Sequence, residues 1–222
     1  MDMTQSERIF ENFCDRLKIK FARVPRGAKK IPDYELTINR QRIIVEVKEI
    51  EKNKDETESD RLAKERGYGQ VLSTMPGQRV RKKIYKSSPQ IKAKTDGVYP
   101  SILALFDGAP LSDHLSNYNI RVAMYGLEEI HIAVPEDPKI SSYITGKSYG
   151  SERKMTPNDN KSISAIGVLH TTSRKEIDLD LYHNKYASNP LDPKLFQNYA
   201  IAQFVLGEGV NGGTAQWERV DV

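Results

Sequence analysis

Hydrophobic and polar positions alternate most regularly between residues 33 and 48. Every second residue is apolar on either side of a short polar break: Tyr34, Leu36, Ile38, Ile43, Val45 and Val47. A period of two is typical of half-buried strands, whose successive side chains point to opposite faces. The pattern therefore predicts two antiparallel strands joined by a tight turn at Asn39-Arg40, although that pair lacks the glycine such turns prefer.

Helical spacing is clearest near the N-terminus. Thr4-Gln5-Ser6-Glu7 reads as a capping box that opens a helix. The apolar residues that follow recur at helical spacing: Ile9, Phe10, Phe13, Cys14 and Leu17. A second, basic helix is expected after Gly77. Ser88-Pro89 is expected to end it and to start another turn, with Ser88 as N-cap and Pro89 as the first helical residue.

The remaining segments predict more sheet with short helices. Strands are expected at residues 20–24, 99–106, 129–134, 163–170 and 177–182, with a last hairpin from 203–206 and 215–220. Helices are expected at 113–125 and 193–199, a loop with some helix at 51–77, and a polar loop at 145–162. The order near the start is helix, three strands, helix, strand, which predicts an α/β fold with a central mixed sheet flanked by helices. One domain is expected over residues 1–222, with a core at about 4–107 and additional C-terminal strands and helices at about 108–222.

Composition favours a water-soluble globular protein. The 222 residues are 38% hydrophobic and 29% charged. No apolar run approaches the roughly 20 residues needed to cross a bilayer, and the first residues lack a secretory pattern. Cys14 is the only cysteine, so we expect a buried structural thiol in a reducing, cytoplasmic compartment.

Basic residues are concentrated in one stretch of the chain. The net charge is only +4, but residues 79–94 carry seven lysines and arginines and no acid. A solvated helix face is one interpretation of such a run, and phosphate binding is the other.

The predicted hairpin brings two acids together. Because side chains alternate, Glu46 and Lys48 share a face that Val47 does not. A two-residue turn pairs Ile38 with Gln41, and counting back places Asp33 opposite Glu46, with Cβ atoms roughly 5 Å apart. Facing carboxylates repel, and a divalent cation between them reverses that effect.

These groups predict a metal site for phosphodiester hydrolysis. Carboxylate oxygens suit Mg²⁺ or Mn²⁺, and the Val47 carbonyl is a further candidate ligand beside Asp33 and Glu46. Lys48 is expected to orient the attacking water or stabilise charge on the phosphorus.

The same residues resemble a known family. Pro32-Asp33, a gap of twelve residues, and Glu46-Val47-Lys48 resemble the signature of the PD-(D/E)xK, or restriction-endonuclease-like, nuclease superfamily. The resemblance covers roughly residues 4 to 107. It implies a restriction-endonuclease-like core and a Mg²⁺-dependent nuclease, with DNA as the expected partner.

The resemblance also implies further site residues. The family often adds an acid from the first helix, where Glu7 lies nearer the apolar face than Glu11 and is the favoured candidate, although it also completes the capping box. Some relatives carry a glutamine on the helix after the Glu-x-Lys strand, and Gln90 occupies a similar place. The expected nucleic-acid-binding residues are Arg79, Arg81, Lys82, Lys83, Lys86 and Gln90.

Two function classes stay open on the sequence. The first is the nuclease, for which cutting both strands of a duplex would favour a homodimer. The second is an inactive nucleic-acid-binding or structural module on the same fold. Cleavage that depends on Mg²⁺ separates them.

Overall fold

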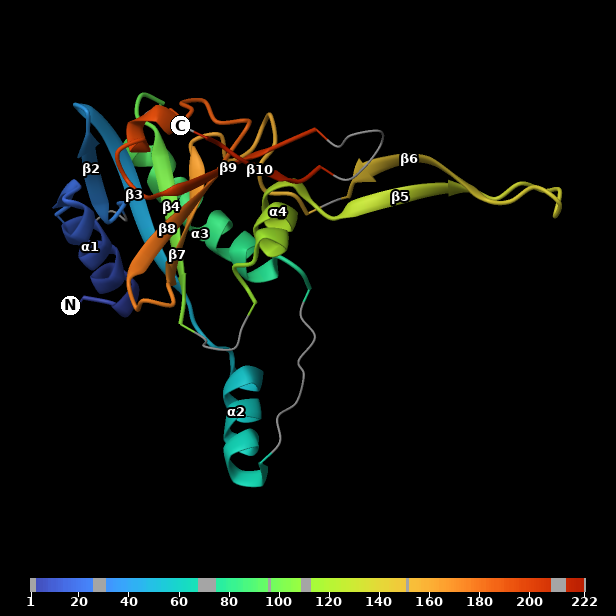
Figure 1. Cartoon of the computed structure of the whole chain (residues 1–222), viewed down its shortest axis with the longest axis horizontal. Helices are drawn as coiled ribbons and strands as arrows, with labels where there is room; N and C mark the ends of the chain where they lie inside the picture. The colour runs from blue at the N-terminus through green and yellow to red at the C-terminus, as the bar shows by residue number, and fades with distance from the viewer. Residues whose placement is uncertain are drawn as a thin grey trace.

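An eight-stranded mixed sheet forms the centre of the structure (Figure 1). This computed structural model describes residues 3–25, 31–67, 75–95, 97–108, 113–150, 152–208 and 215–221. The strand order is β1-β2-β3-β4-β7-β8-β9-β10. The strands are β1 Lys20–Arg23, β2 Tyr34–Ile38, β3 Gln41–Ile50, β4 Ser101–Asp107, β7 Ala165–Thr171, β8 Ile177–His183, β9 Ala202–Leu206 and β10 Trp217–Arg219. Pairing is parallel for β3–β4, β4–β7 and β8–β9 and antiparallel elsewhere in this sheet.

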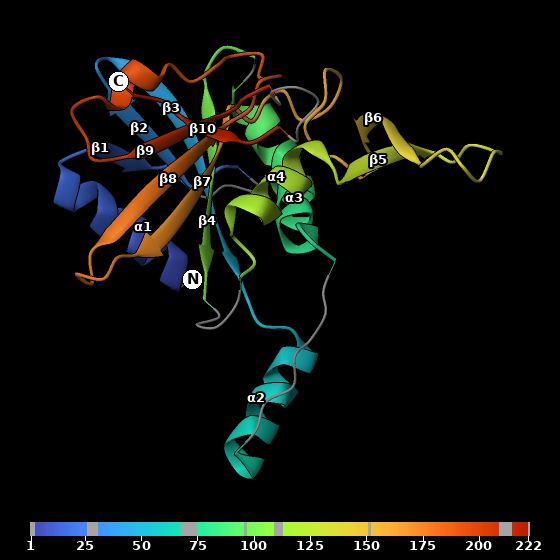
Figure 2. The ribbon, with the colours of Figure 1, turned by 45° about the vertical axis from the view of Figure 1, so that its right-hand side comes forward.

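Helices cover both faces of the sheet. The helical elements are α1 Gln5–Leu17, α2 Lys54–Arg66, α3 Gln78–Thr95, α4 Asn117–Tyr125 and the short 3₁₀ helix η1 Pro193–Phe196. On one face, α1 packs Phe10 and Phe13 against Val45 and Val47 of β3. On the other face, α3 and α4 pack against residues of β3 and β4 such as Leu103 (Figure 2). This arrangement confirms the expected mixed α/β architecture with a helix-flanked central sheet.

The β2–β3 hairpin has the predicted register. Tyr34 pairs with Val45, and Ile38 pairs with Gln41. Asn39 and Arg40 both have positive φ, at 49° and 66°. Two successive left-handed residues define the turn whose twist matches paired strands, so the chain forms it without glycine.

The segment expected as a loop with some helix, residues 51–77, contains a regular helix, α2, which Asn53 and Glu56 open with a reciprocal capping box. The helix α3 does not end at Ser88-Pro89 but continues through Pro89 to Thr95. Ile84 and Ile91 are fully buried on either side of that proline, so packing on the sheet offsets the backbone hydrogen bond that the proline removes.

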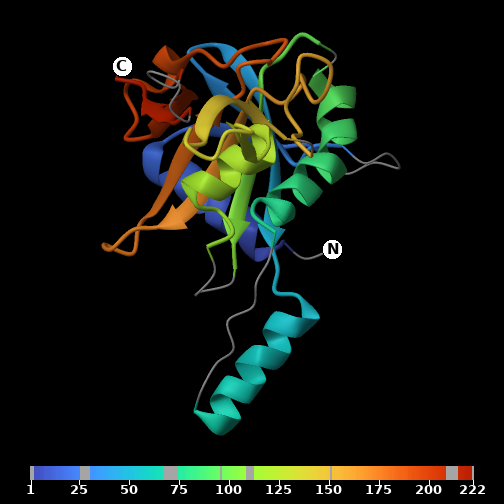
Figure 3. The ribbon, with the colours of Figure 1, turned by 90° about the vertical axis from the view of Figure 1, so that its right-hand side faces the viewer.

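Another difference is a second, separate sheet. Residues 145–149, part of the expected polar loop, belong to β6 (Tyr143–Tyr149), which pairs antiparallel with β5 (Glu128–Ala133). This two-stranded hairpin projects from the body in one direction, and α2 projects in another (Figures 1 and 3). Within the described ranges, no helix is both long and apolar enough to cross a membrane.

Candidate active site

The hairpin register brings Asp33 beside β3. Asp33 immediately precedes β2, and its Oδ2 accepts a hydrogen bond from the Val47 backbone N–H at 2.9 Å. Val45 and Val47 face α1, so Glu46 and Lys48 emerge on the opposite face of the same strand. The structure therefore brings together the three residues that the sequence singled out.

Three oxygen atoms converge on the ammonium group of Lys48. Its Nζ lies 2.5 Å from Glu46 Oε1 and 3.6 Å from Asp33 Oδ2. The same Nζ donates to the backbone carbonyl of Val47 at 3.2 Å. These are the three atoms expected to hold a metal. In this structure they surround the positive charge of Lys48.

Glu46 is the most buried charged group of this cluster. Its side chain is only 1% exposed, and its Oε2 has no hydrogen-bond partner in the described part of the chain. Burial raises the pKa of Glu46 to about 7; the Lys48 charge opposes this shift and the Asp33 carboxylate adds to it. A carboxyl group with a pKa near neutrality and an unpartnered oxygen is typical of a functional site.

The donor set fits a hard divalent cation. Two carboxylates and one carbonyl are oxygen ligands of the kind that Mg²⁺ and Mn²⁺ prefer, and Mg²⁺ usually keeps several waters. No cluster of three or more His, Cys, Asp or Glu suited to a metal occurs in the described ranges. A metal at this hairpin would therefore use Asp33, Glu46 and the Val47 carbonyl, with Lys48 displaced from its present position.

The two acids of α1 both have other partners. Glu7 accepts a hydrogen bond from the Thr4 backbone N–H at 2.8 Å, which completes the predicted capping box. Glu11 accepts from Tyr34 Oη at 2.8 Å and pairs with Arg23 at 2.5 Å. The Arg23 guanidinium lowers the pKa of Glu11, although partial burial opposes this shift. A catalytic role for Glu7 stays a prediction.

Two of the expected phosphate-binding residues form internal ion pairs instead. Arg79 pairs with Glu56 at 2.6 Å and donates to the Glu51 carbonyl at 3.2 Å. Arg81 is only 5% exposed and pairs with Glu152 at 3.1 Å. Arg81 is therefore largely buried in this structure, and its assignment to a nucleic-acid surface stays a prediction.

The other four residues lie on one continuous arc of α3. At about 100° per residue, Lys83, Lys86 and Gln90 lie within about 60° of one another on one flank. That flank faces the end of β3, because Lys83 interacts electrostatically with Glu51 and Lys48. Burial lowers the pKa of Lys83, and the charges of Lys86 and Lys48 act in the same direction. Lys82 is exposed and lies about 40° beyond Lys86 on the same arc.

Sequence reasoning missed an ion-pair cluster next to the site. Lys94, at the end of α3, pairs with Glu35 at 3.0 Å, and Glu35 also pairs with Arg42. Glu35 is two residues beyond Asp33, so strand alternation places it on the same face. That spacing was a signal that a longer acidic face borders α3.

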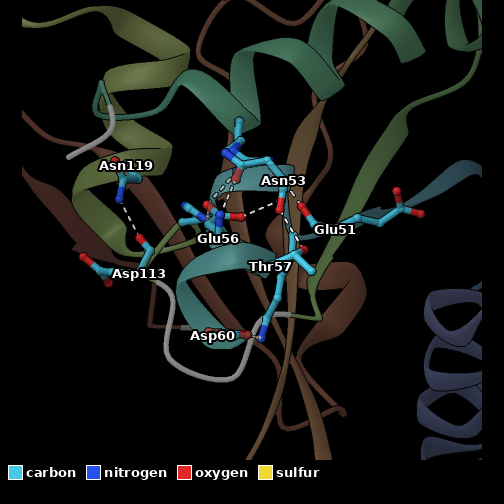
Figure 4. A network of polar contacts seen from close by, with 10 residues as sticks. Glu51, Asn53, Glu56, Thr57, Asp60, Asp113 and Asn119 are labelled. Atoms are coloured by element: carbon cyan, nitrogen blue, oxygen red, sulfur yellow. Dashed lines mark hydrogen bonds and ion pairs between the residues drawn. The ribbon is translucent and has the colours of Figure 1, made fainter. Parts of the chain in front are cut away.

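A second polar network ties the base of α2 to the body (Figure 4). Glu56 Oε1 lies 2.6 Å from Arg79 and 3.2 Å from His114 Nε2. Glu56 Oε2 also accepts from the Asn53 backbone N–H at 2.7 Å. Burial is the largest single effect on the pKa of Glu56 and raises it, but the hydrogen bonds from Asn53 and Arg79 and the nearby positive charge together exceed burial and lower the pKa. This network fixes the start of α2 just after the strand that carries Glu46 and Lys48.

Comparisons with known proteins assign no function to the chain, so its function is inferred from the geometry of the site. Searches against protein-family models, curated proteins and solved structures give no significant match to the chain.

Proposed function

We propose that this protein is a divalent-metal-dependent nuclease that hydrolyses phosphodiester bonds, most readily in DNA, on a restriction-endonuclease-like core. The observation that carries the proposal is the convergence of Asp33 Oδ2, Glu46 Oε1 and the Val47 carbonyl within 3.6 Å of one cation, the Lys48 ammonium group. The Pro-Asp and Glu-x-Lys spacing on a hairpin of the expected register supports the same assignment.

Asp33, Glu46 and the Val47 carbonyl are the proposed Mg²⁺ ligands, and Mn²⁺ is the proposed substitute. The bound ion supplies Lewis acidity toward the phosphate and makes the attacking water more acidic. Glu46 must lose its proton to serve as a ligand. Lys48, released from the two carboxylates, stays beside them to position that water and to stabilise negative charge on the phosphate.

The flank of α3 is the proposed path for the nucleic-acid backbone. Lys83, Lys86 and Gln90 lie on the side of the helix that faces the end of β3. Lysine ammonium groups bind phosphates as point charges without reading sequence. Arg79 and Arg81 are left out of this surface because both are held by glutamates. A cytoplasmic location is proposed from the single cysteine, which is buried.

The test is cleavage of plasmid and linear DNA with and without Mg²⁺. We expect Asp33→Ala and Lys48→Ala each to lower the cleavage rate by roughly 10²–10⁴-fold, the range for removal of acid–base or charge-stabilising groups. Asp60→Ala on α2 is the control and should cleave at the wild-type rate. Equal activity in all four proteins would place the chemistry elsewhere.

A second candidate, an inactive binding module, is favoured by one observation. The Lys48 ammonium group lies 2.5 Å from Glu46 Oε1 and is itself a cation beside the two acids. An internal cation of this kind offsets part of the repulsion between Asp33 and Glu46. Titration with Mn²⁺ separates the two functions: the inactive module should show no metal-dependent rise in melting temperature and no cleavage, whereas the nuclease should show both.

A further inference from the structure

A small pocket lies where the start of α4 meets β10. Its volume is about 260 Å³, and it is lined by Asn117, Tyr118, Arg121, Gln216 and Trp217. Two aromatic rings, two carboxamides and one guanidinium group therefore surround a space that the proposed metal site does not use. Sites that hold drug-sized molecules have roughly 300–1,000 Å³, so this pocket suits a single compact ring system.

The indole of Trp217 is held in place by its neighbours. Its Nε1 donates a hydrogen bond to the Asn117 backbone carbonyl at 2.9 Å. Its ring meets that of Tyr182 edge-on with centroids 4.9 Å apart, and Tyr182 in turn stacks on Phe204 at 5.0 Å. The indole is only partly buried and lines the pocket. A ring that packing has already fixed loses little further freedom when a ligand stacks on it.

Tyr118 and Arg121 supply further planar surface. Tyr118 is 49% exposed, and the Arg121 guanidinium lies 5.7 Å from the centre of its ring. The guanidinium donates to the Ala215 carbonyl and lies 3.2 Å from Glu128 Oε1. Its charge is therefore already paired, and an anion without a ring gains little here. A flat aromatic ligand, in contrast, stacks well on tyrosine, tryptophan or guanidinium planes.

The two carboxamides favour a ring with polar edges. Asn117 Oδ1 accepts a hydrogen bond from Tyr182 Oη, which leaves the amide nitrogen of Asn117 as a donor. Gln216 is exposed and carries both a donor and an acceptor. A purely apolar ring would take water from these groups without replacing its hydrogen bonds, which costs free energy. Nucleobases present carbonyl, amino and ring-nitrogen groups that asparagine and glutamine side chains bond.

We propose that this pocket binds a nucleobase, which stacks on the aromatic and guanidinium planes and is bonded at its edge by Asn117 and Gln216. The base can belong to a free nucleotide or to a single-stranded nucleic acid, since both present the same ring. A base paired within a duplex is not available for such stacking. The proposal does not depend on the nuclease activity, because none of the residues that line the pocket belongs to the metal site.

The test uses the fluorescence of Trp217, which is the only tryptophan of the chain and therefore reports this pocket alone. With a chelator present, adenosine monophosphate should quench the fluorescence in a saturable way, and ribose 5-phosphate, which lacks the base, should not. Single-stranded oligodeoxyadenylate distinguishes the sources: quenching by the strand alone assigns the pocket to nucleic acid, and quenching by both probes assigns it to the base itself. The same strand annealed to its complement should not quench.

Two tyrosine variants give a matched comparison. Tyr118→Ala should weaken binding at least about fivefold, the loss expected when one stacking surface is removed. Tyr143→Ala removes a tyrosine of similar exposure, 57%, from β6 and should bind like the wild type. Both side chains are about half exposed, so neither change should alter the melting temperature.

Asp33→Ala separates this proposal from the nuclease: it should bind the probes like the wild type even though cleavage is lost. The absence of saturable quenching by either adenosine monophosphate or the single strand would overturn the proposal. Equal quenching by ribose 5-phosphate, or unchanged binding in Tyr118→Ala, would do the same.

Discussion

Two antiparallel hairpins of this molecule share an alternation of apolar and polar residues. They differ in whether other elements of the structure cover them. The β2–β3 hairpin lies inside the central sheet, with α1 on one face and α3 on the other. The β5–β6 hairpin stands alone and exposes its isoleucines. Both alternate apolar and polar residues, so alternation by itself does not determine whether a hairpin is covered.

The difference shows how burial changes the properties of a side chain. In β2–β3, burial removes the Glu46 carboxylate from water and raises its pKa to about 7. In β5–β6 polar groups remain hydrated, and the apolar groups are left without a partner. A covered polar residue becomes a candidate for catalysis, and an uncovered apolar residue becomes a candidate for association.

The largest expected effect is a contrast in stability between equivalent truncations. Leu36→Ala, at a position 2% exposed in β2, should lower the free energy of unfolding by about 2–5 kcal/mol through lost burial and a cavity. Ile132→Ala in β5 should change it by less than about 0.5 kcal/mol. Urea denaturation in dilute solution measures both, and similar losses would show that the β5–β6 hairpin is covered.

The next effect concerns the buried acid and pH, measured with a chelator present. Above pH 7, Glu46→Gln should be more stable than the wild type by up to about 3 kcal/mol, because a pKa raised from 4.5 to about 7 penalises the ionised folded state. Between pH 7 and 4.5 the advantage should shrink, since the folded wild type takes up a proton that the unfolded chain does not.

Below pH 4.5 the two proteins should have the same stability, because Glu46 is then protonated in both states of the wild type. Mg²⁺ at 1,000 times its dissociation constant should reverse the order at pH 8 by stabilising only the wild type, by about 4.1 kcal/mol. A constant difference across this pH range would contradict the assigned burial of Glu46.

The smallest expected effect concerns the salt dependence of DNA binding and compares one lysine beside each hairpin. Lys86→Ala, on the α3 flank next to β3, should reduce the slope of log binding constant against log salt for duplex DNA by about 0.9, the loss of one phosphate contact. Lys139→Ala, at the tip of the β5–β6 hairpin, should leave that slope unchanged. Fluorescence anisotropy across a salt series measures both, and equal slopes for the two variants would remove α3 from the proposed DNA path.

The sequence by itself determined the β2–β3 hairpin and the cluster on it. The period of two and the two-residue turn specify the register, because a slip by one residue would turn the apolar side chains of both strands away from the core. The distance from Asp33 to Lys48 is only fifteen positions, so local rules were enough to bring those charges together. The capping box at Thr4 and Glu7 was predictable for the same reason.

Only the tertiary structure decided how deeply those charged groups are buried and which other charged residues are engaged by internal ion pairs. Arg79 is engaged by Glu56 and Arg81 by Glu152, partners 23 and 71 positions away in sequence. Burial of Glu46 and exposure of Ile132 likewise depend on whether another element packs over the hairpin. Desolvation and ion pairing act between segments that folding brings together. A local pattern of polar and apolar residues does not encode which distant segments will meet.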